Sequence, residues 1–223
     1  MRARTSIRRL HIWLTWLAGV PLLLWTVSGL WMAARPIDEV RGTVLRRKPP
    51  QLVLPAVIQP PKLTGPVSSL TLEPRTHGPI WIARFADGRA ARADVATGRW
   101  LPSLDQAEAR AIAQAIYVPV SSIKAATLTP GDKPPLDLRQ RRPAWSVRFA
   151  DGTNVYVDAD TGAVLALRTR QWRAFDWMWG LHIMDLSGRE DTSHPILIGS
   201  AILALIATLA GLILLPLSIK RRR

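Results

Sequence analysis

Two long apolar stretches lie near the ends of the chain and enclose a more polar middle region. Residues 10–34 and 194–219 contain no Asp, Glu, Lys or Arg. At about 1.5 Å per helical residue, each stretch is long enough to cross a hydrocarbon layer of about 30 Å. This pattern predicts two transmembrane helices around an extramembrane region.

The first stretch has a competing interpretation as a cleaved signal peptide, because both begin with basic residues and continue with an apolar run. Its run exceeds the roughly 7–15 apolar residues of a signal peptide. Trp25 and Trp31 also lie where a signal peptide would carry the small residues of its cleavage site. We therefore expect residues 10–34 to remain as a membrane helix.

The middle region repeats one pattern at an offset of 64 residues. The copies are WIARFADGRAARADVATG from Trp81 to Gly98 and WSVRFADGTNVYVDADTG from Trp145 to Gly162, and they align without a gap. Each has a strand, an Asp-Gly turn, a second strand and a Thr-Gly turn before a short return, which predicts two β-hairpins. Valines alternate with other side chains over residues 154–158, the period of a half-buried strand.

Between the two copies the pattern changes to that of a helix. Ser103 has the chemistry of an N-cap for a helix over residues 104–116, and residues 122–129 predict a further strand. The predicted fold class is therefore α+β, with repeated antiparallel hairpins plus one helix, anchored by two transmembrane helices. The expected apolar face of the helix consists of Ala107, Ala111, Ile112 and Ala115.

Two further segments connect this domain to the membrane helices. Residues 35–66 are rich in proline and basic side chains, which predicts an extended linker rather than a helix. Residues 171–187 predict an amphipathic helix at the membrane interface, because tryptophans suit the headgroup level of a bilayer. Its apolar stripe consists of Trp172, Phe175, Trp179, His182 and Leu186.

The net charge of +14 is concentrated partly beside the two apolar stretches. Such basic clusters mark the cytoplasmic flanks of membrane spans, so we expect both termini in the cytoplasm and the middle region on the far side. No nucleic-acid motif accompanies the charge, and nucleic acid is not an expected partner. The clusters are Arg2, Arg4, Arg8 and Arg9 at the start and Lys220, Arg221, Arg222 and Arg223 at the end.

Candidate chemistry is sparse. The chain has no cysteine, which excludes disulfides, cysteine-ligated metal sites and thiol catalysis. The hairpin aspartates occupy turn positions, and no nucleophile motif, phosphate-binding loop or nucleotide fingerprint is present. A seam of small residues in the second span allows close packing against the first span or a second copy, and it could equally receive a flat cofactor. The seam consists of Ser200, Ala204, Ala207, Thr208 and Gly211.

Residues 103–165 resemble a PepSY domain. They follow its order of a helix, a strand and the motif W-x-V-x-F-x-D-G...V-Y-V-D-x-x-T-G-x-V. Residues 81–98 resemble the hairpin half of a second PepSY domain. The membrane segments resemble the PepSY-associated transmembrane family, which includes iron-regulated membrane proteins and ferric-siderophore reductases. Larger members have at least twice as many spans, and here the proline-rich lead-in replaces the helix expected before the first hairpin. The matching positions are Leu10-His11, Ser28-Gly29, Leu181-His182 and the basic end of the second span.

The resemblance implies two different functions. One is a b-haem-binding electron-transfer component of the bacterial inner membrane, linked to ferric-siderophore reduction or iron uptake, which would make the chain a haem-dependent reductase or a reductase subunit. The other is a non-catalytic membrane-anchored module that binds or restrains a periplasmic partner such as a peptidase. By motif, His11 and His182 would be axial ligands of haem iron, with His194 a further candidate. Each histidine also has a structural interpretation, at the interface, in the aromatic belt and at a helix start.

The length of the first span limits how haem could be held. About 30 Å separate His11 from the far end of that span, so His11 and His182 cannot share one iron in a two-span chain. A homodimer could supply the missing ligand at each of two levels, and a His182–His194 pair is an alternative for the outer level. The expected partners are membrane lipid, a second copy or partner membrane subunit, and a ferric-siderophore or periplasmic protein.

The predicted organisation follows from these assignments. It consists of a cytoplasmic N-terminus (1–9), a first transmembrane helix (10–34), a proline-rich linker (35–66), a partial PepSY repeat (67–102), a periplasmic PepSY repeat (103–168), an interfacial helix (171–187), a second transmembrane helix (194–219) and a cytoplasmic tail (220–223).

Overall fold

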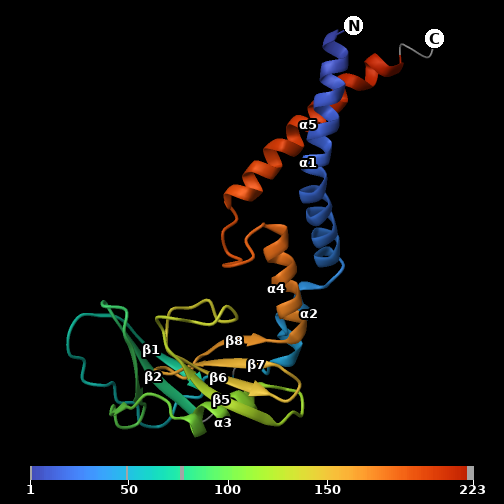
Figure 1. Cartoon of the computed structure of the whole chain (residues 1–223). Coiled ribbons are helices and arrows are strands. Elements are labelled where there is room, and N and C mark those ends of the chain that lie inside the picture. Colours follow the sequence, from blue (N-terminus) through green and yellow to red (C-terminus); the bar gives the residue numbers. More distant parts are fainter. Residues whose placement is uncertain (1, 49, 76–77, 220–223) are drawn as a thin grey trace. The chain divides into compact units, whose positions relative to one another are not determined.

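A computed structural model describes residues 2–48, 50–75 and 78–219, and its fold is α+β (Figure 1). The chain divides into two units. One comprises the residues up to Pro36 and from Arg173 onward, and the other comprises Ile37–Trp172. His77 and the basic cluster from Lys220 to Arg223 lie outside the described residues.

The first unit is built around two long helices, α1 (Arg2–Ala33) and α5 (Pro195–Ile219). Within them, Arg8–Ala33 and Pro195–Pro216 are long and apolar enough to cross a membrane, and only 6% of the most apolar part of each is buried. A core helix of a soluble protein would be largely covered, so these two exposed apolar helices suggest membrane anchoring. The helical conformation of α1 starts well before the predicted span.

The small-residue seam of α5 packs against α1. Ala207 is buried, and Gly211 lies so close to α1 that an added Cβ would come 3.0 Å from Cε1 of His11. Further along the seam, Ala204 lines a small cavity together with Trp25 of α1. The predicted packing against the first span is therefore confirmed.

The second unit contains two four-stranded antiparallel sheets, and in each sheet every strand pairs with the next one along the chain. A single long helix, α3 (Gln106–Ile116), lies between the two sheets in sequence. The first sheet consists of β1 (Val67–Arg75), β2 (Gly78–Phe85), β3 (Ala90–Asp94) and β4 (Trp100–Leu101), and the second of β5 (Ile123–Thr129), β6 (Ala144–Phe149), β7 (Asn154–Asp158) and β8 (Val164–Arg168).

The strand registers confirm the predicted hairpin repeat. Trp81 pairs with Ala93 in the β2–β3 hairpin, and Trp145 pairs with Val157 at the equivalent position of β6–β7. The glycines of the two Asp-Gly turns both have a φ of 86°. Glycine adopts this left-handed conformation without steric cost, which explains why the turn sequence is the same in both copies.

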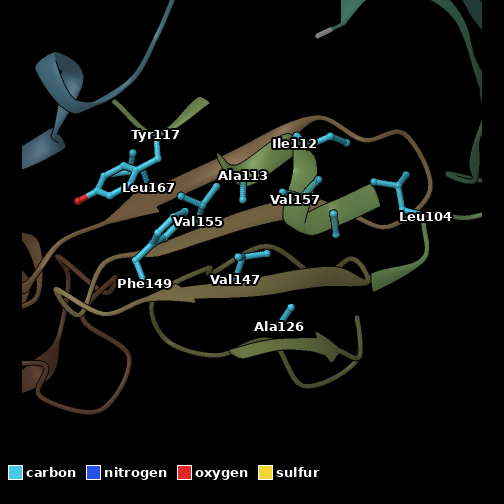
Figure 2. Close-up of a cluster of buried hydrophobic side chains, with 11 residues drawn as sticks. Leu104, Ile112, Ala113, Tyr117, Ala126, Val147, Phe149, Val155, Val157 and Leu167 are labelled. Atoms are coloured by element: carbon cyan, nitrogen blue, oxygen red, sulfur yellow. The ribbon is translucent and has the colours of Figure 1, made fainter. Parts of the chain in front are cut away.

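The core of the second unit lies between α3 and one face of the second sheet (Figure 2). Ile112 and Ala113 of α3 pack in one cluster with Val147, Val155 and Val157 of the central strands. Burying a side chain of this size stabilises a fold by about 1.5–3 kcal/mol. This cluster therefore provides much of the stability of the second unit.

The other face of the second sheet is covered as well. Leu138, from the loop between β5 and β6, packs with Ala144 and Tyr156 and is only 1% exposed. As a result, every residue of β7 is buried. The prediction of a half-buried strand is wrong here, because the long loop covers the face that the alternation assigned to solvent.

The start and the buried face of α3 differ from the prediction. Asp105, rather than Ser103, is the N-cap, and its carboxylate accepts a 2.8 Å hydrogen bond from the Glu108 backbone N–H. Alanines occur on every side of this helix, so their spacing did not define the face that packs. The buried residues are Ala109, Ile112, Ala113 and Ile116, and Ile112 alone belongs to the predicted face.

The proline-rich lead-in is extended only in its later part. It begins with the short helix α2 (Ile37–Arg41) and the 3₁₀ turn η1 (Thr43–Leu45), which form because this stretch contains no proline. Arg46 then forms an isolated bridge with the C-cap residue of α3, and the Gln59 backbone N–H donates to a carbonyl beside the first sheet. The prediction of a wholly non-helical linker is therefore wrong for its first third.

Helix α4 (Arg170–His182) occupies the segment that was predicted to be an interfacial helix, but it ends earlier than expected. Met184 has a φ of 58°, so the chain leaves the helix there. Leu186 is consequently not part of the predicted stripe and is 53% exposed.

Candidate functional site

His182, the last residue of α4, contacts α1 through both of its ring nitrogens. The Trp25 indole N–H donates to Nε2 over 2.8 Å. Nδ1 lies 3.1 Å from the Ser28 hydroxyl oxygen and 3.2 Å from the Trp25 carbonyl oxygen. Ser28 is only 1% exposed. The histidine thus completes a small polar cluster between α1 and α4, inside the first unit.

These contacts assign the tautomer of His182. Because Nε2 accepts a hydrogen bond from Trp25, the proton of the neutral imidazole is on Nδ1. The Ser28 hydroxyl donates to the Leu24 carbonyl over 2.6 Å, which leaves its oxygen free to accept from Nδ1. The arrangement is therefore that of a neutral imidazole with both nitrogens in use.

Small and aromatic residues shape the space around the His182 ring. An added Cβ at Gly29 would come 3.0 Å from Cε1 of His182, a tight contact, so glycine favours this close approach to α1. The rings of Trp25 and Trp179 lie 5.6 and 6.4 Å from the imidazole, within the range of aromatic contacts. Ser28-Gly29 and His182, noted separately in the sequence, thus belong to one site.

Two buried acids lie near the end of α4, Asp176 within the helix and Asp185 in the turn after His182. Asp176 pairs with Arg189 over 2.9 Å, and its side chain is 6% exposed. Asp185 accepts hydrogen bonds from three backbone N–H groups of the turn, and the bond from Gly188 is the main cause that lowers its pKa well below the usual range. These bonds end α4 and thereby position His182. The one sequence signal for this turn was Asp185, which precedes Ser187-Gly188 by two residues.

His11 lies on α1, at a distance from His182. Its ring faces Gly211 of α5, and its Nδ1 is buried without a hydrogen-bond partner among the described residues. Buried polar atoms in native proteins nearly always have a partner. The Nδ1 atom of His11 is therefore a candidate site for a group that the described residues do not supply.

His194 lies at the start of α5, immediately before Pro195. Its carbonyl accepts the Ile198 backbone N–H in the first turn of the helix. Its Nδ1 is also buried without a partner among the described residues. The backbone role agrees with the interpretation of His194 as a helix-start residue, and its ring remains a candidate ligand.

The three histidines do not form one metal site. His182 contacts residues of α1 that follow His11 by 14 to 18 positions, which corresponds to about 21–27 Å along the helix. His11 and His182 therefore cannot bind one iron, as the sequence predicted. Within the described ranges, no group of three or more His, Asp or Glu side chains converges to hold a metal ion.

The carboxylates of the hairpins serve the fold. Asp94 and Asp158 accept the backbone N–H groups of Thr97 and Thr161 in equivalent turns, each over 2.8 Å. Hydrogen bonds from the Thr97 hydroxyl and N–H lower the pKa of Asp94. Both carboxylates therefore hold equivalent turns of the two hairpins.

A cavity of about 190 Å³ lies between α3 and the first sheet. Arg92 of β3 forms two hydrogen bonds with the Glu108 carboxylate at this cavity. Arg75 has a buried Nε without a partner among the described residues, but its Nη2 donates to the Glu73 carboxylate and to the Thr161 carbonyl. Because the guanidinium groups and carboxylates balance, the cavity has no net charge that would select an ionic ligand.

Comparison with protein families gives one match. Residues 103–168, which contain α3 and the second sheet, match the PepSY family model, described as "Peptidase propeptide and YPEB domain". Comparison with curated proteins and with solved structures gave no significant match. The match covers less than a third of the 223 residues, and the resemblance of the membrane segments to the transmembrane family stays a prediction. The chain contains a PepSY domain at residues 103–168.

Proposed function

We propose that the chain is a membrane-anchored PepSY module that binds a polypeptide partner, such as a peptidase, and has no catalytic site of its own. The observation that carries this proposal is the PepSY match over residues 103–168, and the acids of the hairpins have structural roles beside it. They are Asp87, Asp94, Asp151, Asp158 and Asp160, whose carboxylates accept hydrogen bonds from Arg89, Thr97, Thr153, Thr161 and Ser103, respectively.

Strand β5 is the surface on which we expect the partner to add. It is an edge strand whose neighbour in the sheet is β6, and Leu128 is 50% exposed. An extended polypeptide can pair with such an edge through main-chain hydrogen bonds. The Ala126 carbonyl is already covered by the Gln106 side chain, so we expect pairing at residues 127–129.

Photo-cross-linking in cells tests this proposal. A photoreactive amino acid at Leu128 should yield a discrete adduct with one polypeptide, which mass spectrometry would identify. Val120, which is fully exposed in the loop before β5, is the matched control and should yield little of that adduct. Equal adducts from both positions, or none from Leu128, would contradict binding at this edge.

The module would act in the periplasm, with both chain ends in the cytoplasm of a bacterial cell. The exposed Arg8 and Arg9 at the start of the first candidate span support this orientation. A reporter that is active only in the cytoplasm should work when fused after Arg223 and should fail when inserted near Gly131. Activity at Gly131 would reverse the topology.

A second candidate function is haem-linked electron transfer across the inner membrane, connected with ferric-siderophore reduction or iron uptake. A specific observation favours it: His182 has its proton on Nδ1, and this nitrogen lies 3.2 Å from a backbone carbonyl. Metal-binding histidines commonly hold their second nitrogen in this way. His11 adds a buried ring nitrogen without a partner among the described residues, at a second level of α1.

The two histidines fit haem to different degrees. The Nε2 atom of His182 already accepts the Trp25 indole N–H, so Trp25 would have to turn away before His182 could bind iron. His11 needs no such change at Nδ1. Haem would supply one-electron chemistry when bound, and His11 and His182 would hold it, in a reductase or a reductase subunit. His194 is a further ligand candidate.

An absorption spectrum distinguishes the two candidate functions. The full chain, purified in mild detergent from haem-replete cells, should show b-type bands if haem is bound, and His11→Ala or His182→Ala should reduce them by about half or more. His77→Ala is the matched control, because the sequence places it outside both apolar stretches. Folded protein that stays colourless with added haemin would reject haem binding and leave the binding module.

A further inference from the structure

An exposed apolar stretch follows three exposed basic residues in the lead-in. Arg46, Arg47 and Lys48 are exposed, and no ion pair among the described residues involves them. The apolar side chains that follow are 42–72% exposed. We call residues 46–48 and 50–58 the basic–apolar segment. Its exposed apolar side chains are Leu52, Val53, Leu54, Val57 and Ile58.

This segment is fixed at both ends, so its exposure is not that of a loose tail. The Arg47 backbone N–H donates to the Ile116 carbonyl over 2.9 Å. At the other end, the Gln59 carbonyl accepts the Trp81 indole N–H over 2.9 Å. Between these two attachments, residues 50–58 make no hydrogen bond to the rest of the described chain. The second unit therefore holds an apolar stretch outward.

Such an arrangement is unfavourable in water. Contiguous exposed apolar side chains usually mark a surface that contacts a protein or a membrane. The backbone of this stretch has no internal hydrogen bonds, so it cannot enter the hydrocarbon layer. At the level of the lipid headgroups, however, the backbone stays hydrated while the apolar side chains are buried below it.

Charge and tethering decide between a membrane and a protein as the occupant. The basic residues begin only 13 positions after Ala33, the end of α1, and a chain of that length reaches at most about 45 Å. Lysine and arginine near a membrane helix are attracted to anionic headgroups. The tether therefore keeps the segment close to the bilayer. A bilayer can bind both its basic part and its apolar part, through the headgroups and the layer below them.

We propose that the basic–apolar segment is an interfacial anchor that binds the anionic headgroup layer, with Val53 and its apolar neighbours inserted below the phosphates. This contact would add a third attachment to the two membrane helices and limit how the PepSY domain moves above the bilayer. It is independent of whether the domain binds a polypeptide or the helices bind haem.

The absence of cysteine makes this proposal directly testable, because single cysteines can be labelled without removing others. Full-length Val53→Cys and Val120→Cys, each with an environment-sensitive fluorophore, would be reconstituted in phosphatidylethanolamine vesicles with or without phosphatidylglycerol. Val120 is the control because it is fully exposed in the same unit. Flotation would verify that both variants are inserted.

With phosphatidylglycerol present, the label at position 53 should shift to the blue and be quenched by brominated lipid at least about twice as strongly as the label at position 120. Replacing Arg46, Arg47 and Lys48 by Gln should reduce that difference, as should high salt. A label at position 53 that is as accessible to water-soluble quencher as the one at position 120 would overturn the proposal. Protection in native membranes but not in vesicles would likewise overturn it, in favour of a protein occupant.

Discussion

Phe85 and Phe149 occupy the same position in the two FADG sequences, yet their surroundings differ. Phe149 is 1% exposed, and its ring lies 4.5 Å from that of Tyr117. Phe85 is half-buried, with Trp100 at 6.3 Å. The apolar face of α3 packs on the second sheet and produces this difference. The same local sequence therefore makes the same hairpin, while the helix decides which of the two equivalent phenylalanines is buried.

The first repeat is attached by polar contacts instead. Arg92 of β3 donates to the Glu108 carboxylate on α3, and the Trp81 indole donates to the Gln59 carbonyl in the lead-in. Hydrogen bonds add about 1 kcal/mol each when neutral and about 1.5–3 kcal/mol when charged, less than the about 3–5 kcal/mol lost on truncating a buried phenylalanine. We therefore expect the second repeat to set the stability of the domain and the first repeat to depend on it.

Matched truncations give the largest expected effect. Phe149→Ala should lower the free energy of unfolding by about 3–5 kcal/mol, because it leaves a cavity in the core. Phe85→Ala should lower it by about 1 kcal/mol, since that ring is only partly buried. Urea unfolding of the full chain in mild detergent, followed by tryptophan fluorescence, measures both. Equal losses would mean that the two repeats carry equal shares of the core.

The equivalent turn aspartates offer a second comparison. Asp158 accepts the Arg142 guanidinium over 2.8 Å and its side chain is 4% exposed, whereas Asp94 forms no such ion pair within the described ranges. Asparagine keeps the turn bonds and removes the charge. Asp158→Asn should therefore cost about 1–2 kcal/mol and Asp94→Asn less than about 0.5 kcal/mol. Melting temperatures of the two variants would rank them, and the reverse order would contradict the assignment.

Some features of this molecule follow from local chemistry and were predictable. The Asp-Gly and Thr-Gly turns require glycine at their left-handed positions, so the sequence located both hairpins. The length of the two stretches without charged residues was enough to indicate the two apolar helices. The N-cap of α3 was missed because Ser103 and Asp105 have similar capping chemistry, and the burial of Leu104 selects Asp105.

The surroundings of His182 could not be predicted, because its partners are distant in the sequence. Trp25 and Ser28 lie more than 150 residues away from it. The stripe in α4 indicated that the imidazole faces a neighbour, but not that both nitrogens are engaged. Its ligand role stays a prediction. The early end of α4 was missed because Asp176 and Arg189 pair only in the folded turn.

The two hairpin tryptophans give a smaller contrast. Trp145 donates to the Leu104 carbonyl at the start of α3, so Trp145→Phe should lower the melting temperature through the loss of about 1 kcal/mol. Trp81 ties down the lead-in, so Trp81→Phe should leave the melting temperature nearly unchanged and accelerate proteolysis between residues 50 and 60. Limited proteolysis with a melting curve checks both, and a cleavage pattern that is identical in the two variants would argue against the separate roles.

The smallest expected difference is in acid sensitivity. Partial burial raises the pKa of Asp151, but hydrogen bonds from the Thr153 backbone N–H and from the Tyr117 hydroxyl outweigh it and leave the pKa below its usual value. A lowered pKa in the folded state stabilises the fold above the unfolded value of about 3.9, and this contribution is lost as the pH falls below about 4.

Because Asp151 is exposed and its interactions are screened, the contribution should be only about 0.5 kcal/mol. Asp151→Asn should therefore melt slightly below the parent chain at pH 6 and approach it at pH 3. The matched variant is Asp87→Asn in the first repeat, whose carboxylate contacts Arg89 on the surface rather than the core residue Tyr117. A constant offset in melting temperature between Asp151→Asn and the parent from pH 6 to pH 3 would show that the lost contact is not linked to ionisation. An equal pH response of Asp151→Asn and Asp87→Asn would remove the distinction between the two turns.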